Sequence, residues 1–296
     1  MAELELAQHP FRQPAYVTRR NRAGAGRFAP NVSGHLEPRR PPAVLYQRTP
    51  MYPRQVSRFV VGSPDPPSTA PSGLLASWLP PGVVAAEVSF AGPLDALYPS
   101  EEAFVARAGE KRRSEFRAGR HCARRVLASL GVVATAVPQG RGRMPLWPEG
   151  VVGSISHSGD LELGYAVAVG ARSSEVRALG VDIEREPALA ENLWDRILTP
   201  EELRFIERLA RPEHAPTALV VFGIKECVYK CQYPLLGQAL EFTEVSVSLD
   251  LEQGRFQLRS QNPQVEALLG PASGAVGQFR RVAGWLACVF VLPAKP

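Results

Sequence analysis

Proline and arginine are distributed very unevenly along the 296 residues of this chain. Residues 1–72 hold 12 of the 28 prolines and 10 arginines against four acidic residues, whereas the rest of the chain carries 24 basic and 25 acidic residues. A segment so rich in proline, with few apolar positions in periodic order, buries too little surface to offset its ordering entropy. We therefore expect a disordered arm over residues 1–73 and a folded part from Leu74 onward.

The composition excludes several classes of protein. With 45% apolar and 21% charged residues, the chain is typical of a soluble globular protein and not of a collagenous or disulfide-rich one. No apolar run is long enough to cross a bilayer, and residues 1–5 (MAELE) are acidic where a secretory signal is basic. The four cysteines form no C-x-x-C pair and the five histidines are scattered, so no zinc pattern emerges. We expect a monomeric cytoplasmic protein with reduced thiols.

Helix-like and strand-like segments alternate in the folded part without the regular βαβ rhythm of a doubly wound sheet. Caps and stops predict one long or two short helices between Ser100 and Gly131, a helix that starts at the capping box Thr199-Pro200-Glu201-Glu202, and a helix over residues 217–232 that stops near Pro234. Short β-branched apolar segments predict strands at 151–157, 163–169, 178–184, 242–249, 255–259 and 285–292. These elements favour the α+β class.

Two acidic residues alternate with apolar ones in the segment Gly180-Val181-Asp182-Ile183-Glu184. On a strand, Asp182 and Glu184 project from one face while Val181 and Ile183 face a core. Two carboxylates about 7 Å apart repel each other unless a cation lies between them, and oxygen-only ligands suit Mg²⁺. The alternative is a strand end with two solvated acids.

The segment Phe222 to Lys230 holds two of the four lysines in a chain that has 30 arginines. Lysine is therefore expected here for its compact ammonium. Lys225 is followed directly by Glu226, and Glu226 and Lys230 share one face of a helix that is apolar on both sides. The simpler interpretation of this pair is a surface ion pair. Buried charges instead need partners, which a metal and a phosphate supply.

A third group of residues suggests phosphate binding. The loop at 139–150 combines glycine, arginine and proline, and the segment 153–158 (GSISHS) follows it. Glycines permit close approach of the backbone and arginines fork onto phosphate. Arginines at 113, 117, 120 and 124 form one helical stripe, which by itself is typical of a solvated face. No serine here has the G-x-S-x-G context of a hydrolase nucleophile.

In combination, these motifs resemble a known family. The order G-R-x-P-x-W-P, G-S-I-S-H-S, G-V-D-I-E and F-x-x-K-E-x-x-Y-K is similar to the 4'-phosphopantetheinyl transferases, in the branch typified by enterobactin synthetase component D. The resemblance covers about residues 75–292, and the segment 118–124 (AGRHCAR) matches the same branch. Cys227 and Phe222 differ from the residues that the family usually has there, but keep a similar size or aromatic character. The arm has no counterpart.

The resemblance implies a fold of two similar α/β halves in a pseudo-two-fold arrangement, which we expect at residues 74–178 and 179–296. It also implies transfer of the phosphopantetheine arm of coenzyme A, the co-substrate, to a serine of an acyl or peptidyl carrier protein. Adenosine 3',5'-bisphosphate is the other product. The active site is expected in the cleft between the halves.

The resemblance assigns roles to named residues. The carboxylates expected to hold Mg²⁺ against the coenzyme A pyrophosphate are Asp182, Glu184 and Glu226. The residues expected to bind the phosphates and the nucleotide of coenzyme A are Arg112, Arg120, Arg143, Met144, Pro145, Ser156, His157 and Lys230. Lys230 is also expected to neutralise charge during catalysis. The serine proton goes to Glu226 or to a metal-bound water, with Lys225 as an assistant.

Two other functions use the same residues. Acids, lysines and phosphate-binding arginines also suit a metal-dependent nucleotide phosphohydrolase. A non-enzymatic nucleic-acid-binding protein would act through the basic arm, although the folded part has no basic excess to support it. The carrier and its pathway, whether for siderophores, nonribosomal peptides, polyketides or fatty acids, are not specified by these motifs.

Overall fold

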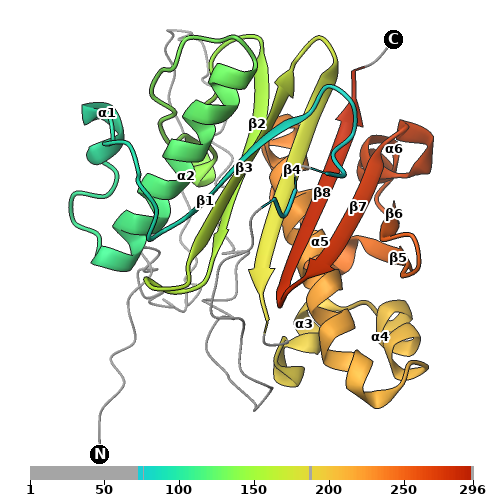
Figure 1. Ribbon diagram of the computed structural model, residues 1–296. Helices are drawn as coiled ribbons and strands as arrows, with labels where there is room; N and C mark the ends of the chain where they lie inside the picture. Colours follow the sequence, from blue (N-terminus) through green and yellow to red (C-terminus); the bar gives the residue numbers. More distant parts are fainter. Residues whose placement is uncertain (1–72, 76, 187–188, 295–296) are drawn as a thin grey trace, which may run out of the picture. The chain divides into compact units, whose positions relative to one another are not determined.

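A computed structural model of the protein describes residues 73–75, 77–186 and 189–294, which all belong to the compact unit Val56–Pro296. The arm predicted over residues 1–73 lies outside the described residues, apart from Gly73. The described part contains a three-stranded sheet of order β1-β3-β2 and a five-stranded sheet of order β4-β8-β7-β6-β5, with helices packed on them (Figure 1). All pairings are antiparallel. The predicted α+β class is confirmed.

The strands are β1 (Val84–Ser89), β2 (Val151–Ser158), β3 (Tyr165–Arg172), β4 (Val176–Arg185), β5 (Ser246–Asp250), β6 (Arg255–Arg259), β7 (Val276–Val282) and β8 (Trp285–Pro293). The α-helices are α1 (Pro99–Glu102), α2 (Glu110–Ser129), α3 (Trp194–Ile197), α4 (Pro200–Glu207), α5 (Arg211–Leu236) and α6 (Pro263–Leu269). Among these described helices, none is both long and apolar enough to span a membrane.

Helix α2 covers one face of the first sheet. Its residues Ala118, Cys122 and Val126 pack against Ala166 and Ala168 of the central strand β3. Small side chains on both elements let the helix lie close to the strand, and every residue of β3 except the last is buried. Because β3 is flanked within the sheet by β1 and β2, strand β2 becomes the edge strand next to the second sheet.

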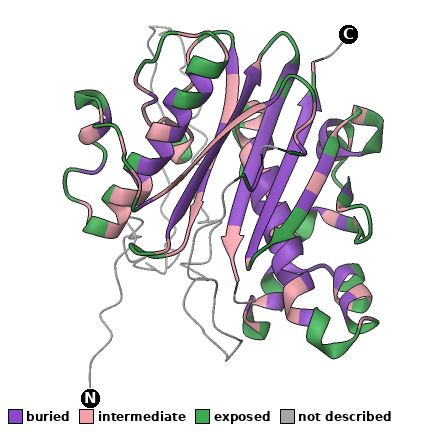
Figure 2. Ribbon diagram, in the orientation of Figure 1, coloured by how far each residue is buried: buried purple, intermediate pink, exposed green. Residues whose placement is uncertain are grey.

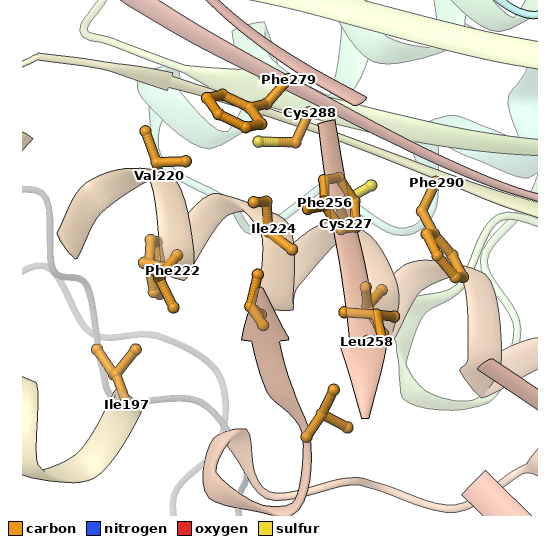
Figure 3. Packing of buried hydrophobic residues seen from close by; sticks show 14 of the residues in the cluster. Ile197, Val220, Phe222, Ile224, Cys227, Phe256, Leu258, Phe279, Cys288 and Phe290 are labelled. Atoms are coloured by element: carbon orange, nitrogen blue, oxygen red, sulfur yellow. The ribbon is translucent and has the colours of Figure 1, made fainter. Parts of the chain in front are cut away.

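Helix α5 is the central helix of the second half of the chain and packs on β4 and β8 (Figure 1). Figure 3 shows Ile224 and Cys227 of this helix packed among Phe256, Phe279 and Phe290 of the strands. A Cβ atom at Gly180 of β4 would lie 1.9 Å from the Cys227 carbonyl oxygen, so only glycine permits this approach. The close contact brings the residues after Gly180 next to α5.

The two sheets share a core. Val167 of β3, Val181 and Ile183 of β4, and Val289 of β8 belong to one buried cluster, and the rings of Tyr165 and Trp285 lie 5.7 Å apart within it. Figure 2 shows β4 and β8 buried along most of their length. The predicted division into halves at residues 178 and 179 falls inside β4, and it stays a prediction.

Several predicted boundaries are wrong for identifiable reasons. Ser100 lies inside α1, because Pro99 takes the first helical position and Tyr98 becomes the N-cap. Helix α5 starts before residue 217 and continues past Pro234, ending where Gly237 adopts a left-handed conformation (φ 63°). The strand predicted at 242–249 is β5, which begins only at Ser246. The capping box at Thr199 is confirmed.

Candidate active site

Three carboxylates and one ammonium gather where β4 meets α5. Asp182 and Glu184 occupy alternate positions of the strand, and Glu226 and Lys230 are one turn apart on the helix. Asp182 and Glu226 are 3% and 7% exposed. The Lys230 ammonium donates to Asp182 Oδ1 at 2.6 Å and to Ser156 Oγ at 3.0 Å. The sequence therefore placed these four charges correctly on neighbouring elements.

The acidic side chains of this group outnumber its one ammonium. Burial, followed by the Asp182 carboxylate, raises the pKa of Glu184 to about 8, and burial raises the pKa of Glu226 to about 8 against the opposing effect of Lys230. Burial disfavours the charge of Lys230, but Asp182 and Glu226 outweigh it and raise its pKa above the ordinary value. Three acidic side chains thus share one ammonium, and Glu184 and Glu226 keep their protons up to about pH 8 unless a further cation binds and favours their ionised forms.

The donor set fits a magnesium ion in chemical terms. Asp182 Oδ2 is buried and has no hydrogen-bond partner among the described residues, and the three acids offer oxygen ligands only. In the described part of the chain, however, no three His, Cys, Asp or Glu side chains are arranged as a metal-binding group. Lys230 holds Asp182 instead. The convergence of the three acids on one ion therefore stays a proposal.

A basic group lies on the other side of β2. Arg112 Nη1 is 3.1 Å from His157 Nε2 and 3.3 Å from Glu115, and the Arg120 guanidinium lies 4.1 Å from the centre of the Phe116 ring. Burial, together with Arg112, Lys230, Lys111 and Arg120, holds the pKa of His157 well below its ordinary value. A neutral His157 therefore lies near several cations, with the Glu115 carboxylate 3.9 Å from its Nδ1 atom.

Arg120 shows most clearly that this group needs anions. Its side chain is 5% exposed, and its Nε and Nη2 atoms are buried without a hydrogen-bond partner in the part of the chain that the structure describes. Burial lowers the pKa of Arg120 to about 10, and Arg112 and Arg124 add to the effect against Glu101. A buried guanidinium with two unused donors is suited to an anion such as phosphate.

The predicted nucleotide loop lies against α5. Gly142 and Arg143 both have left-handed backbone conformations, with φ values of 63° and 67°. A Cβ atom at Gly142 would lie 2.5 Å from the Tyr233 hydroxyl, so any other residue here would force the loop or the tyrosine to shift. Burial and the charge of Arg112 lower the pKa of Arg143, which joins the loop to the basic group. Met144 and Pro145 belong to the same loop, where Met144 accepts a backbone hydrogen bond from Gly140.

Lys225 does not lie with the other charged residues. Its ammonium donates to Glu202 Oε2 and to the Ile197 carbonyl oxygen, both at 2.7 Å, and both side chains of the ion pair are 2% exposed. Glu202 also accepts hydrogen bonds from the backbone N–H groups of Thr199 and Val247. Lys225 is adjacent to Glu226 in the sequence but points to a different side of α5, toward α4. These contacts support a structural role for Lys225 in place of the predicted catalytic assistance.

Sequence reasoning missed the contacts of the serines on β2. Sequence reasoning predicts Ser156 as a nucleotide contact, which stays a prediction, and the structure places the Ser156 hydroxyl 2.9 Å from Asp182 Oδ1. Ser158, which it did not select, makes the equivalent contact with Glu184 Oε2 at 3.0 Å, and Ser154 lies two residues before Ser156. The alternation of serine in GSISHS was the available signal, because residues two apart share one face of a strand.

Comparisons with known proteins agree with this geometry. Residues 100–169 match the family model "4'-phosphopantetheinyl transferase N-terminal domain", and residues 178–273 match the "4'-phosphopantetheinyl transferase superfamily". The chain is 36% identical over 177 residues to 4'-phosphopantetheinyl transferase Npt of Nocardia iowensis, an alignment that covers 60% of this chain and 77% of that protein. It is 39% identical over 127 residues to enterobactin synthase component D of Salmonella typhi, which covers 42% of this chain and 49% of that protein.

Among solved structures, holo-[acyl-carrier-protein] synthase of Thermotoga maritima is similar over 40% of this chain and 65% of that chain, with 18% identity and a TM-score of 0.32. The family models and the sequence relatives are sufficient, without this structural similarity, to assign the chain to a family. This chain belongs to the 4'-phosphopantetheinyl transferase superfamily and is an enzyme. The resemblance seen in the sequence motifs is confirmed.

The raised pKa of Glu226 predicts an unusual pH dependence of stability. Between the ordinary pKa of 4.5, which applies to the unfolded chain, and the folded value of about 8, the folded protein keeps a proton on Glu226 that the unfolded chain has lost. This stabilisation is complete below pH 4.5 and is lost as the pH rises through 8. In EDTA, the melting temperature of Glu226→Gln minus that of the wild type should therefore increase as the pH rises from 5 to 8.5.

The exposed Glu252 provides the control for this measurement. Glu252→Gln should keep a constant difference in melting temperature from the wild type over the same pH range. If the Glu226→Gln difference is equally constant, Glu226 titrates normally and its place in a buried acidic group is wrong.

Proposed function

We propose that the protein transfers the 4'-phosphopantetheine group of coenzyme A to a serine hydroxyl of an apo acyl or peptidyl carrier protein, with release of adenosine 3',5'-bisphosphate. One observation carries the proposal. An acidic group that needs a cation and a basic group that needs anions lie on the two sides of one strand, β2. A substrate that bears several phosphates and arrives with a divalent cation satisfies both groups.

The basic group is proposed to bind the phosphates of coenzyme A. Arg120 offers two buried donors without partners in the described structure, and Phe116 supports its guanidinium plane from one side. Arg112 lies within hydrogen-bond distance of neutral His157, so these two side chains are held together at the surface of α2. We propose that Arg112 and Arg120 hold the 3'-phosphate end and that His157 donates to a phosphate oxygen.

The loop that carries Arg143, Met144 and Pro145 is proposed to line the nucleotide. The backbone bridge between Gln139 and Pro145 and the fixed φ of its prolines restrict the loop before any ligand arrives, which limits the entropy lost on binding. The effect of Arg112 on the pKa of Arg143 places both guanidinium groups in one electrostatic field. The nucleotide is therefore expected between the loop and the basic group.

The acidic group is proposed to hold Mg²⁺ through Asp182, Glu184 and Glu226. When bound, the ion neutralises charge on the pyrophosphate and orients it for attack. Lys230, which donates to Asp182 and Ser156, can then contact a phosphate oxygen with its third N–H group. The ammonium would thus add positive charge where the transferred phosphoryl group gains negative charge.

Glu226 is our choice for the residue that takes the serine proton. Without a cation, Glu226 keeps its own proton up to a pKa of about 8, so it would act as a base once a bound divalent cation favours its ionised form. Its position one helical turn from Lys230 puts the base next to the cation that stabilises the phosphoryl group. Lys225 has no part in this step, because its ammonium is engaged by Glu202 and Ile197.

The remaining details of the partner and setting are also proposals. Action by a monomer in the cytoplasm is part of the same proposal. Relatives named as enterobactin synthase component D support a carrier of siderophore or nonribosomal peptide assembly. Polyketide carriers have the same reactive serine chemistry and belong in the same panel.

The transfer reaction can be tested directly by intact mass. Incubation with an apo carrier protein, coenzyme A and MgCl₂ should increase the carrier mass by one phosphopantetheine group. Asp182→Asn and Glu226→Gln should lower the rate at least about 100-fold, because each removes a charge from the metal group without adding bulk. Circular dichroism should show that both variants remain folded.

An unchanged carrier mass across peptidyl, polyketide and fatty-acid carriers would contradict the proposal. Release of phosphate from coenzyme A without a carrier would indicate a phosphohydrolase instead. Full activity of either acid variant would show that the metal assignment is wrong.

Replacement of Arg120 tests the basic group separately. Arg120→Ala should raise the KM for coenzyme A about tenfold or more with a small effect on kcat, because binding energy at a remote phosphate is the same in the ground and transition states. The exposed Arg204→Ala serves as the control, since Arg204 pairs only with surface Glu201 in the described structure. A loss confined to kcat would place Arg120 in the chemical step instead.

A further inference from the structure

The edges of the two sheets meet through serine hydroxyls. Strand β2 is the edge of the first sheet and β4 is the edge of the second. The backbone N–H groups of Val181, Ile183 and Arg185 on β4 donate to the hydroxyl oxygens of Ser154, Ser156 and Ser158 on β2, at 3.1, 3.3 and 3.2 Å. We call these three hydrogen bonds the serine seam.

The serine seam has a regular register. Each serine pairs with the residue 27 positions later in the sequence, and both strands advance by two residues from one hydrogen bond to the next. The two strands therefore run in the same direction, with side-chain hydroxyls in place of backbone acceptors. Without them, the N–H groups of Val181 and Ile183 would be buried without partners, at a cost of about 1–3 kcal/mol each, whereas that of Arg185 is partly buried.

Two of the three serines do more than close the seam. A hydroxyl can accept one hydrogen bond and donate another at the same time. Ser156 and Ser158 accept from the N–H groups of Ile183 and Arg185, and each donates to the carboxylate of the residue that precedes this N–H group. Ser156 thus holds Asp182, and Ser158 holds Glu184. Ser154 accepts from Val181 in the same way, and its backbone partner is preceded by Gly180, which has no carboxylate. Ser154 is therefore a control for the contacts that Ser156 and Ser158 make with carboxylates.

The intervening residues of β2 face the other way. Ile155 packs on α2, where a Cβ atom at Gly119 would lie 2.8 Å from it, and His157 meets Arg112 of the same helix. The serines of β2 therefore face the acids of β4, and the alternate residues of β2 face the basic group of α2. A fixed seam sets the distance between the two groups.

We propose that Ser158 is a positioning residue for the metal site: by accepting from the Arg185 N–H group and donating to Glu184 Oε2, it holds Glu184 beside Asp182. This inference rests on the proposed function, because it takes Glu184 as a ligand of Mg²⁺. Hydrogen bonds to ligating carboxylates typically change metal affinity or activity about 10–100-fold when removed. Ser158 never needs to touch the substrate to have this effect.

The test compares Ser158→Ala with Ser154→Ala in the full-length protein. Each variant removes one bond of the serine seam, so both should lower the melting temperature in EDTA. The MgCl₂ concentration that gives half of the maximal transfer rate, and the concentration that gives half of the Mg²⁺-dependent rise in melting temperature with coenzyme A present, should both increase about tenfold in Ser158→Ala. In Ser154→Ala they should stay within about twofold of the wild type.

A second pair of variants keeps the test decisive if the alanine variants unfold. Ser158→Thr retains the hydroxyl and should keep the wild-type response to MgCl₂, whereas Ser158→Val has nearly the same shape as the threonine variant and should lose it. A normal response in Ser158→Ala or Ser158→Val, or an equal loss in Ser154→Ala, would overturn the positioning role. If the wild type itself shows no response to MgCl₂ in either measurement, the metal assignment fails before the variants are compared.

Discussion

The contact between the edges of β2 and β4 is the constraint on which the site depends. Two edge strands that met through a backbone ladder would merge the sheets and leave no place for side chains between them. Serine hydroxyls satisfy the N–H groups of β4 and still have a proton to donate. The same atoms that join the sheets therefore orient the acidic side chains of β4.

The charge distribution follows from this arrangement. Gly180 lets α5 approach β4, which brings Glu226 and Lys230 over the two acids of the strand. On the opposite face of β2, α2 presents Arg112 and Arg120. Within the described structure, the first group has three acids for one ammonium, and the second has a buried guanidinium with unpaired donors. The charges of both Lys230 and Arg112 act on neutral His157, which lies between the two groups. A phosphate-bearing ligand with a divalent cation resolves both imbalances at once.

Much of this could be predicted from the sequence, because the informative residues follow local periodicities. The acids at 182 and 184 and the charges at 226 and 230 lie on the elements that their spacing predicted. The spacing could not show which face of α5 meets β4. It therefore predicts that Lys225 acts beside Glu226, whereas Lys225 forms an ion pair with Glu202 of α4. The strand β7 and the seam between the sheets depend on contacts between distant segments, and local patterns carry no information about them.

The most direct test of the central claim is a crystal structure of the protein with coenzyme A and MnCl₂, in which anomalous scattering locates the metal. The account predicts one strong peak that is bonded to Asp182, Glu184 and Glu226, with phosphate oxygens on Arg112 and Arg120 and Lys230 turned toward the pyrophosphate. A peak elsewhere, or a Glu226 that faces away from both acids of β4 while coenzyme A is bound, would contradict it.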